Sequence, residues 1–127
     1  MEESGTVTQD GVEIAIQRVN VDVTSATATL LRTPASGKRV RVFACALIGV
    51  GADNTFYFRS GASTDVFCSS SNPYPLSLLS GVGYPALLLN RNQDGWFEGE
   101  VDEALYLVTT TSGPVEGSVL LGDAPGS

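Results

Sequence analysis

The chain has 127 residues, of which 43% are hydrophobic and 17% charged, a composition typical of one globular domain. Its net charge of −7 argues against nucleic acid as a partner, because phosphate binding requires a basic surface. The sequence contains no histidine, which removes histidine-based nucleophilic catalysis and most zinc sites, and its one lysine lies in a predicted turn. We therefore expect a protein that is not an enzyme and that binds no cofactor.

The first residues, 1–11, are polar and lack a period, which predicts a flexible N-terminal arm that a partner orders. This acidic start lacks the apolar core of a secretory signal, and no apolar run approaches the roughly 20 residues that cross a bilayer. From Val12 the sequence alternates as a strand does. The phase of the alternation changes near Arg18, which predicts a β-bulge or a strand break.

After a short strand over residues 26–32 and a turn over 33–37, residues 39–48 form the clearest predicted strand. Strict alternation places Val40 and Val42 on one face and Phe43 and Cys45 on the other. Cys45 lies inside this apolar run, so we expect a buried free thiol. A disulfide with Cys68 is the alternative if the two strands are neighbours.

Further short strands are predicted over residues 55–59, 65–68, 76–79, 84–89, 104–111 and 115–121, separated by turns rich in glycine, proline and asparagine. Eight to ten short antiparallel strands without an amphipathic helix predict an all-β fold, a β-sandwich of the jelly-roll type. The immunoglobulin spacing is missing, because Trp96 follows both cysteines. We expect one domain over residues 12–121, followed by a polar C-terminal tail over residues 122–127.

Two features after residue 90 bear on function. Trp96 and Phe97 are adjacent, so in a strand we expect one to enter the core and the other to be exposed, where it could anchor an interface. The acidic run over residues 98–103 is interpreted as a solvated connection between strands. Calcium binding and carboxylate catalysis are alternatives, although no calcium-loop spacing is present.

Basic residues gather around the long predicted strand. Residues 1–41 contain five basic and five acidic side chains, whereas residues 42–127 contain two basic and nine acidic ones. We interpret Arg32, Lys38, Arg39 and Arg41 either as solvated strand and turn faces or as a patch that docks on an acidic protein surface.

A series of segments resembles small structural proteins of tailed bacteriophages over roughly residues 38–121. The segments that carry the resemblance are Arg39–Val42, Asn54–Gly61, Asp94–Glu98, Glu103–Leu107 and Val115–Val119. The series looks most like capsid decoration (cement) proteins of the jelly-roll type. In the usual pattern the connection after Trp-Phe-Glu is short and neutral, whereas here it is acidic.

The resemblance implies a homotrimer that is made in the host cytoplasm and binds the major capsid protein on the virion surface. It supplies no catalytic residue. From the net charge and the lack of a long apolar run, we expect neither nucleic acid nor a membrane as partner. The basic segment and the N-terminal arm would contact the capsid. The alternative is a head-fibre, tail or baseplate module, or a carbohydrate-binding domain for host attachment, in which an exposed Trp96 or Phe97 and the Tyr74 and Tyr84 loops would form the ligand face.

Overall fold

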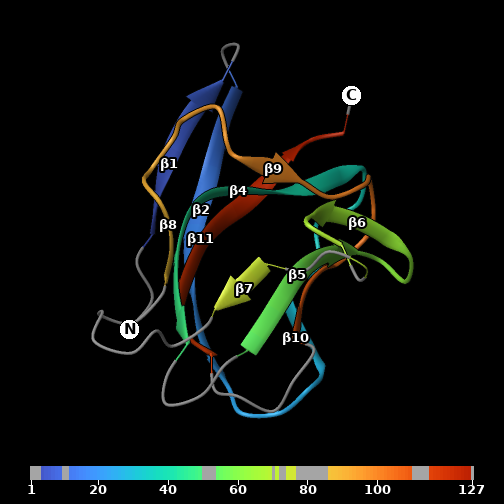
Figure 1. The fold of residues 1–127 in the computed structure, drawn as a ribbon. Coiled ribbons are helices and arrows are strands. Elements are labelled where there is room, and N and C mark those ends of the chain that lie inside the picture. The colour runs from blue at the N-terminus through green and yellow to red at the C-terminus, as the bar shows by residue number, and fades with distance from the viewer. Residues whose placement is uncertain are drawn as a thin grey trace.

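A computed structural model of the chain describes residues 4–9, 12–49, 54–69, 71, 74–76, 86–109 and 115–126. Over these residues the protein contains eleven strands, no helix, and two sheets in which all paired strands are antiparallel (Figure 1). The prediction of an all-β sandwich is confirmed. In this part of the chain there is accordingly no helix that could span a membrane.

The two sheets differ in size. Sheet A contains, in spatial order, β1 (Ser4–Gln9), β2 (Val12–Val23), β11 (Val115–Pro125), β4 (Lys38–Gly49) and β8 (Ala86–Leu89), with β9 (Phe97–Glu98) also paired to β4. Sheet B contains β3 (Ala28–Arg32), β10 (Leu105–Thr109), β5 (Asn54–Ser60) and β6 (Thr64–Phe67), with β7 (Tyr74–Leu76) also paired to β5.

The ends of the chain are more regular than their polar composition predicts. Residues 4–9 of the predicted arm form β1, which pairs with β2 without a register shift, and Met1–Glu3 and Asp10–Gly11 lie outside the described residues. Residues 122–125 of the predicted tail continue β11, where they pair with β4. Polar residues enter these strands because backbone hydrogen bonds to a neighbour stabilise a strand even where its side chains face water.

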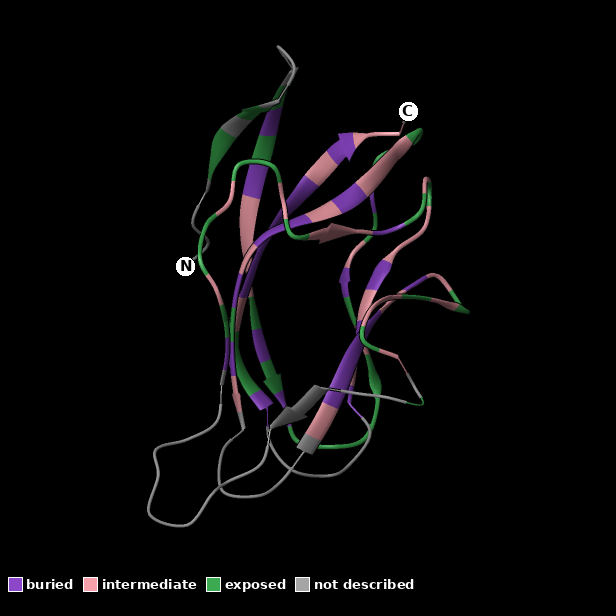
Figure 2. Cartoon of the chain, turned by 45° about the horizontal axis from the view of Figure 1, so that its top comes forward, coloured by how far each residue is buried: buried purple, intermediate pink, exposed green. Residues whose placement is uncertain are grey.

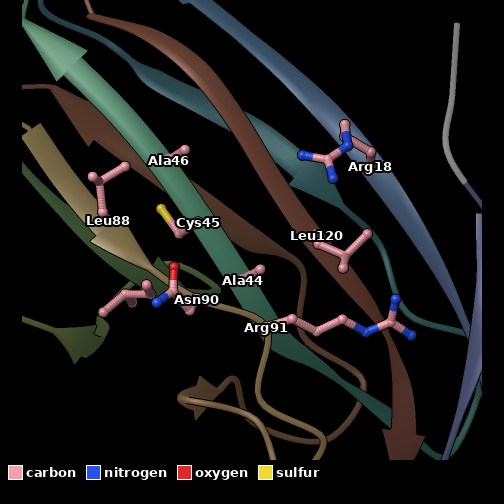
Figure 3. Close-up of a pocket in the computed structure, with 9 residues that line it drawn as sticks. Arg18, Ala44, Cys45, Ala46, Leu88, Asn90, Arg91 and Leu120 are labelled. Atoms are coloured by element: carbon pink, nitrogen blue, oxygen red, sulfur yellow. The ribbon is translucent and has the colours of Figure 1, made fainter.

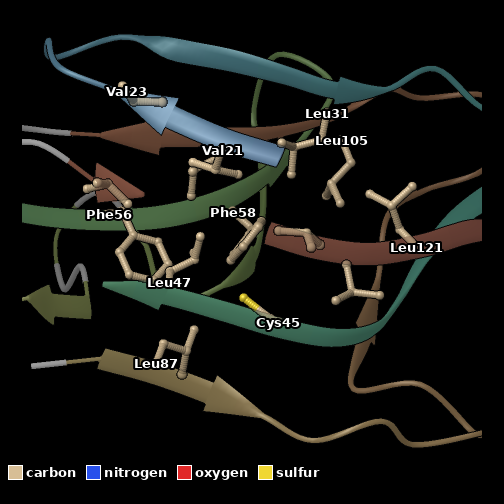
Figure 4. Close-up of a cluster of buried hydrophobic side chains, with 14 of the residues drawn as sticks. Val21, Val23, Leu31, Cys45, Leu47, Phe56, Phe58, Leu87, Leu105 and Leu121 are labelled. Carbon is tan, nitrogen blue, oxygen red and sulfur yellow. The ribbon is translucent and has the colours of Figure 1, made fainter. Parts of the chain in front are cut away.

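The main core lies between the sheets (Figure 4). Sheet B contributes Phe56 and Phe58, both fully buried, whose rings meet edge-on with centroids 5.7 Å apart. Sheet A contributes Leu47 and Cys45, among others. Buried and exposed residues alternate along the long strands (Figure 2), as expected where each strand presents one face to the core.

A β-bulge lies in β4 and not, as predicted, in β2. The register with β11 shifts between Leu120, which faces Ala44, and Leu121, which faces Val42, so Phe43 is the extra residue. Consequently Val42 and Cys45 both point into the main core, and the predicted alternation of this strand is wrong after Val42.

The change of phase in β2 has a different cause. This strand pairs with β11 without a register shift. In its first half Ile14 and Ile16 pack in a second cluster with Phe43 and Leu120, whereas in its second half Val21 joins the main core. The two halves therefore bury opposite faces of one regular strand.

The connection from β8 to β9 runs along the edge of β4 at the bulge. The Asn92 N–H donates to the Phe43 carbonyl over 2.9 Å, and the Trp96 N–H donates to the Val42 carbonyl over 2.8 Å. The Arg91 guanidinium reaches the Thr6 carbonyl of β1 at 3.4 Å, so the connection also crosses toward the far edge of the sheet (Figure 1). These bonds fix the loop that carries Trp96.

Candidate interaction surfaces

The arginines of β4 are held by one carboxylate. Glu98 lies opposite Arg41 in the β4–β9 pair, and its Oε1 accepts a hydrogen bond of 2.6 Å from Arg41 Nε. Its Oε2 accepts one of 2.8 Å from Arg39 Nη1. Arg39 also donates to the Gly126 carbonyl at 3.0 Å. The negative charge of Glu98 therefore reduces the repulsion between the neighbouring positive charges of Arg39 and Arg41.

Arg32 is bound in a similar way at the end of β3. Its Nε and Nη2 donate to the two carboxylate oxygens of Asp123 over 2.7 and 2.9 Å, and its Nη1 donates to Gln17 over 3.0 Å. The hydrogen bonds from Arg32 lower the pKa of Asp123 below its ordinary value, with a smaller contribution from the Ala35 N–H. A bidentate pair of this kind joins sheet B to β11 of sheet A.

The four predicted docking residues thus lie beside two carboxylates, Arg32 and Lys38 beside Asp123 and Arg39 and Arg41 beside Glu98. Arg32, Arg39 and Arg41 each form an ion pair within the chain, and Lys38 lies near enough to Asp123 to help lower its pKa. The sequence indicated the basic side chains but not their partners, because Glu98 and Asp123 are 57 to 91 residues away from them. A docking role for the four residues stays a prediction.

Trp96 and Phe97 separate as the alternation predicts. The Phe97 ring packs between Phe58 and Phe67, with centroids 4.8 and 5.1 Å away, and joins the main core. Trp96 is 46% exposed, and its indole N–H donates to the Asn90 carbonyl over 2.7 Å. It lies in an open hollow of about 250 Å³ beside β4 and β9.

A second feature is a shallow groove of about 230 Å³ on the outer face of sheet A, next to β8. Apolar and basic residues and one asparagine line it: Arg18, Ala44, Cys45, Ala46, Leu88, Leu89, Asn90, Arg91 and Leu120. Leu88 stands on one side of the alanines of β4 and is 68% exposed, and Arg18 lies across β11 on the other side (Figure 3). The sequence predicts the apolar strand over residues 84–89 that borders this groove, but not the groove itself, because its other sides come from β2, β4 and β11.

The acidic connection over residues 98–103 is bound to its surroundings. The Asp102 carboxylate accepts a hydrogen bond of 2.6 Å from the Gly37 N–H, and Glu103 accepts one of 3.3 Å from the buried Ser60 hydroxyl. Within the described ranges no group of three or more histidine, cysteine or acidic side chains is placed to hold a metal ion. The carboxylates of this segment thus fix turns and neighbouring strands.

The two cysteines are both free. Cys45 is buried, as expected, and burial raises the pKa of its thiol to about 12, so it is not a nucleophile at neutral pH. Cys68 is exposed after β6, and no disulfide joins it to Cys45. Tyr84, one of the tyrosines considered for a ligand face, lies outside the described residues.

Comparison of the chain with protein-family models, with curated proteins and with solved structures finds no match. The interpretation of these surfaces therefore depends on their own chemistry and on the sequence resemblance.

Proposed function

We propose that the chain is a structural protein of a bacteriophage virion that binds the outer surface of the capsid and stabilises contacts between neighbouring capsomers. The observation that carries the proposal is the groove on the outer face of sheet A. Its apolar residues Ala46 and Leu88 are exposed, although burying a leucine side chain typically stabilises by about 1.5–3 kcal/mol. An exposed apolar surface with a polar rim is typical of a protein contact.

The shape of the groove favours a protein partner over a small molecule. Its floor contains the small side chains Ala44 and Ala46, which leave room for a side chain from a facing surface. Arg18 and Arg91 at its rim favour an acidic neighbour, and both are already positioned by hydrogen bonds, to Ser118 and Thr6. The capsid protein as that partner is an inference from the resemblance over residues 38–121.

The ion-paired arginines contribute to the same contact in this proposal. A guanidinium has five N–H donors, so Arg39 and Arg41 can bind Glu98 and still offer donors to a capsid carboxylate. Pairing within the chain also fixes their side chains before binding, which lowers the entropy lost on docking.

The resemblance further supports a jelly-roll topology and a homotrimer at a local three-fold axis of the capsid. Three copies joined in this way would bind with an avidity far above that of one copy, because the second and third contacts become intramolecular. We expect the purified protein to have the mass of a trimer, and virions to contain it in hundreds of copies. A few copies per particle would instead favour the head-fibre, tail or baseplate alternative.

The decisive experiment compares two exposed leucines on different sheets. Leu88 lies in the groove, and Leu30, which is 53% exposed, lies on β3 of sheet B. We expect Leu88→Glu to weaken binding to heads lacking the protein by about thirtyfold or more, as for a residue central to an interface, and Leu30→Glu to leave it unchanged. Equal effects of the two variants would exclude the groove as the contact, and a wild-type monomer that does not bind such heads would refute the capsid role.

A further inference from the structure

The side chain of Trp96 is exposed but fixed in position. Its indole N–H donates to the Asn90 carbonyl, so the polar edge of the ring is bound within the chain. Its backbone N–H donates to the Val42 carbonyl at the bulge of β4. With both bonds made, the ring leaves part of its apolar surface in water, and tryptophan is a residue type that is enriched at binding interfaces.

The turn before Trp96 is also rigid. The Asn92 carbonyl accepts a hydrogen bond of 3.0 Å from the Gly95 N–H, and the Asn92 side-chain oxygen accepts one of 2.9 Å from the Asp94 N–H. Gly95 has a φ of +82°, and a Cβ there would lie 2.6 Å from the side chain of Arg41. A glycine is therefore required at position 95 for this turn to lie against Arg41. Asp94 and Trp96, the two neighbours of Gly95 in the chain, are held in place by the turn.

The hollow beside Trp96 combines an aromatic surface with planar polar groups. Its lining residues are Arg41, Asp94, Gly95, Trp96, Phe97 and Glu98, and its volume of about 250 Å³ is below the range of pockets that take drug-sized ligands. Asp94 is exposed, and its carboxylate accepts no hydrogen bond from the described part of the chain. Arg39 and Arg41 carry two positive charges, and Glu98 and Asp94 carry two negative ones, so the formal charges around the ring cancel.

We propose that this hollow binds a neutral saccharide, with one sugar ring stacked on Trp96. A sugar ring has an apolar C–H surface that packs on an aromatic ring, and a rim of hydroxyls that hydrogen-bond to carboxylates and guanidinium groups. Asp94 would accept bonds from these hydroxyls, and Arg41 would donate to them. The ring and the turn are already in place, so little entropy is lost on binding.

The same features disfavour other ligands. Asp94 lies where an anion or a phosphate backbone would be repelled, and the chain as a whole carries a charge of −7. A cation would stack on tryptophan, but Arg41 in the lining and Arg39 beside Glu98 oppose a further positive charge. A ligand that is neutral, polar at its rim and flat on one side satisfies the lining best.

The chain provides its own probe, because Trp96 is its only tryptophan. Tryptophan emission of the purified full-length protein is recorded while glucose, galactose, N-acetylglucosamine and their short oligomers are added. We expect at least one of these sugars to shift the emission in a saturable way at millimolar concentration, and an oligomer to bind more tightly than its monomer. Free arginine and a lysine-rich peptide serve as cation probes.

Variants then test the assignment by calorimetry, which does not need the fluorophore. Trp96→Ala is expected to weaken sugar binding by about tenfold or more, Asp94→Ala by less, and Trp96→Phe to keep part of the affinity. Leu88→Glu, in the separate groove, leaves sugar binding unchanged and so distinguishes this site from the groove of the proposed capsid contact. Saturable shifts with the cation probes alone, or no response to any neutral sugar, would overturn the proposal.

Discussion

The two sides of β9, taken together with Trp96 directly before it, differ although their residues are adjacent in the chain. Phe97 faces inward and packs against Phe58 and Phe67, where its ring is partly buried at the main core. Trp96 and Glu98 face outward, where hydrogen bonds and ion pairs fix them while part of their surface stays in water. The inner side thus contributes mainly to stability, and the outer side combines a stable scaffold with a surface that is left open for a ligand.

The largest expected effect tests the inner side. Phe97→Ala removes a ring that packs against two others, and it should lower the free energy of unfolding by about 2–3 kcal/mol, somewhat less than for a fully buried phenylalanine. For a domain of this size the melting temperature should fall by about 10 °C. Thermal unfolding followed by circular dichroism measures this.

Trp96→Ala is the matched control for that substitution. It removes a larger ring from a position that is 46% exposed, together with one side-chain hydrogen bond, and should cost less than about 1 kcal/mol. If it destabilised the protein as much as Phe97→Ala does, the contrast between the two sides of β9 would be lost.

The next effect tests the outer side. Glu98→Gln keeps the shape of the side chain but leaves Arg39 and Arg41 adjacent without an anion between them. Because all three side chains are only partly exposed, we expect a loss of about 1–2 kcal/mol, between the values for surface and buried pairs. Chemical denaturation gives the free energy. Glu116→Gln, on the exposed face of β11, should change it by less than about 0.5 kcal/mol.

The sequence could predict the features that depend on residues close together in the chain, but not those that depend on distant ones. The opposite orientations of Trp96 and Phe97 follow from local alternation, and the burial of Cys45 follows from the apolar run around it, so both could be predicted. The extra residue Phe43 could not, because a bulge depends on pairing with β11, whose residues lie more than 70 positions further along the chain.

The partners of the arginines were hidden for the same reason. A basic segment can be read from composition, but whether it faces solvent or binds Glu98 and Asp123 depends on the strand order of a sheet that connects distant parts of the chain. The sandwich itself could be predicted, since it requires only the spacing of strands and turns.

The smallest effect concerns the link between the sheets. Bonds from Arg32 hold the pKa of Asp123 below its ordinary value of 3.8, so the carboxylate is stabilised in its charged form by folding. The resulting stability is fully present above that ordinary pKa and is lost as the pH falls through the lower pKa of the folded state. At pH 7 we expect Asp123→Asn to be less stable than the wild type by about 1 kcal/mol.

The test is the difference between the two proteins across pH, because the other carboxylates titrate in both. The gap in melting temperature should stay constant from about pH 7 down to about pH 5, and shrink below about pH 4 as Asp123 takes up a proton in the wild type. A gap that is the same at pH 7 and at about pH 2.5 would mean that Asp123 stabilises the fold through its shape and its bond from the Ala35 N–H, and not through its charge. In that case the ion pair of Arg32, which joins the two sheets, would contribute less to stability than the pairing of Glu98 with Arg39 and Arg41 within sheet A.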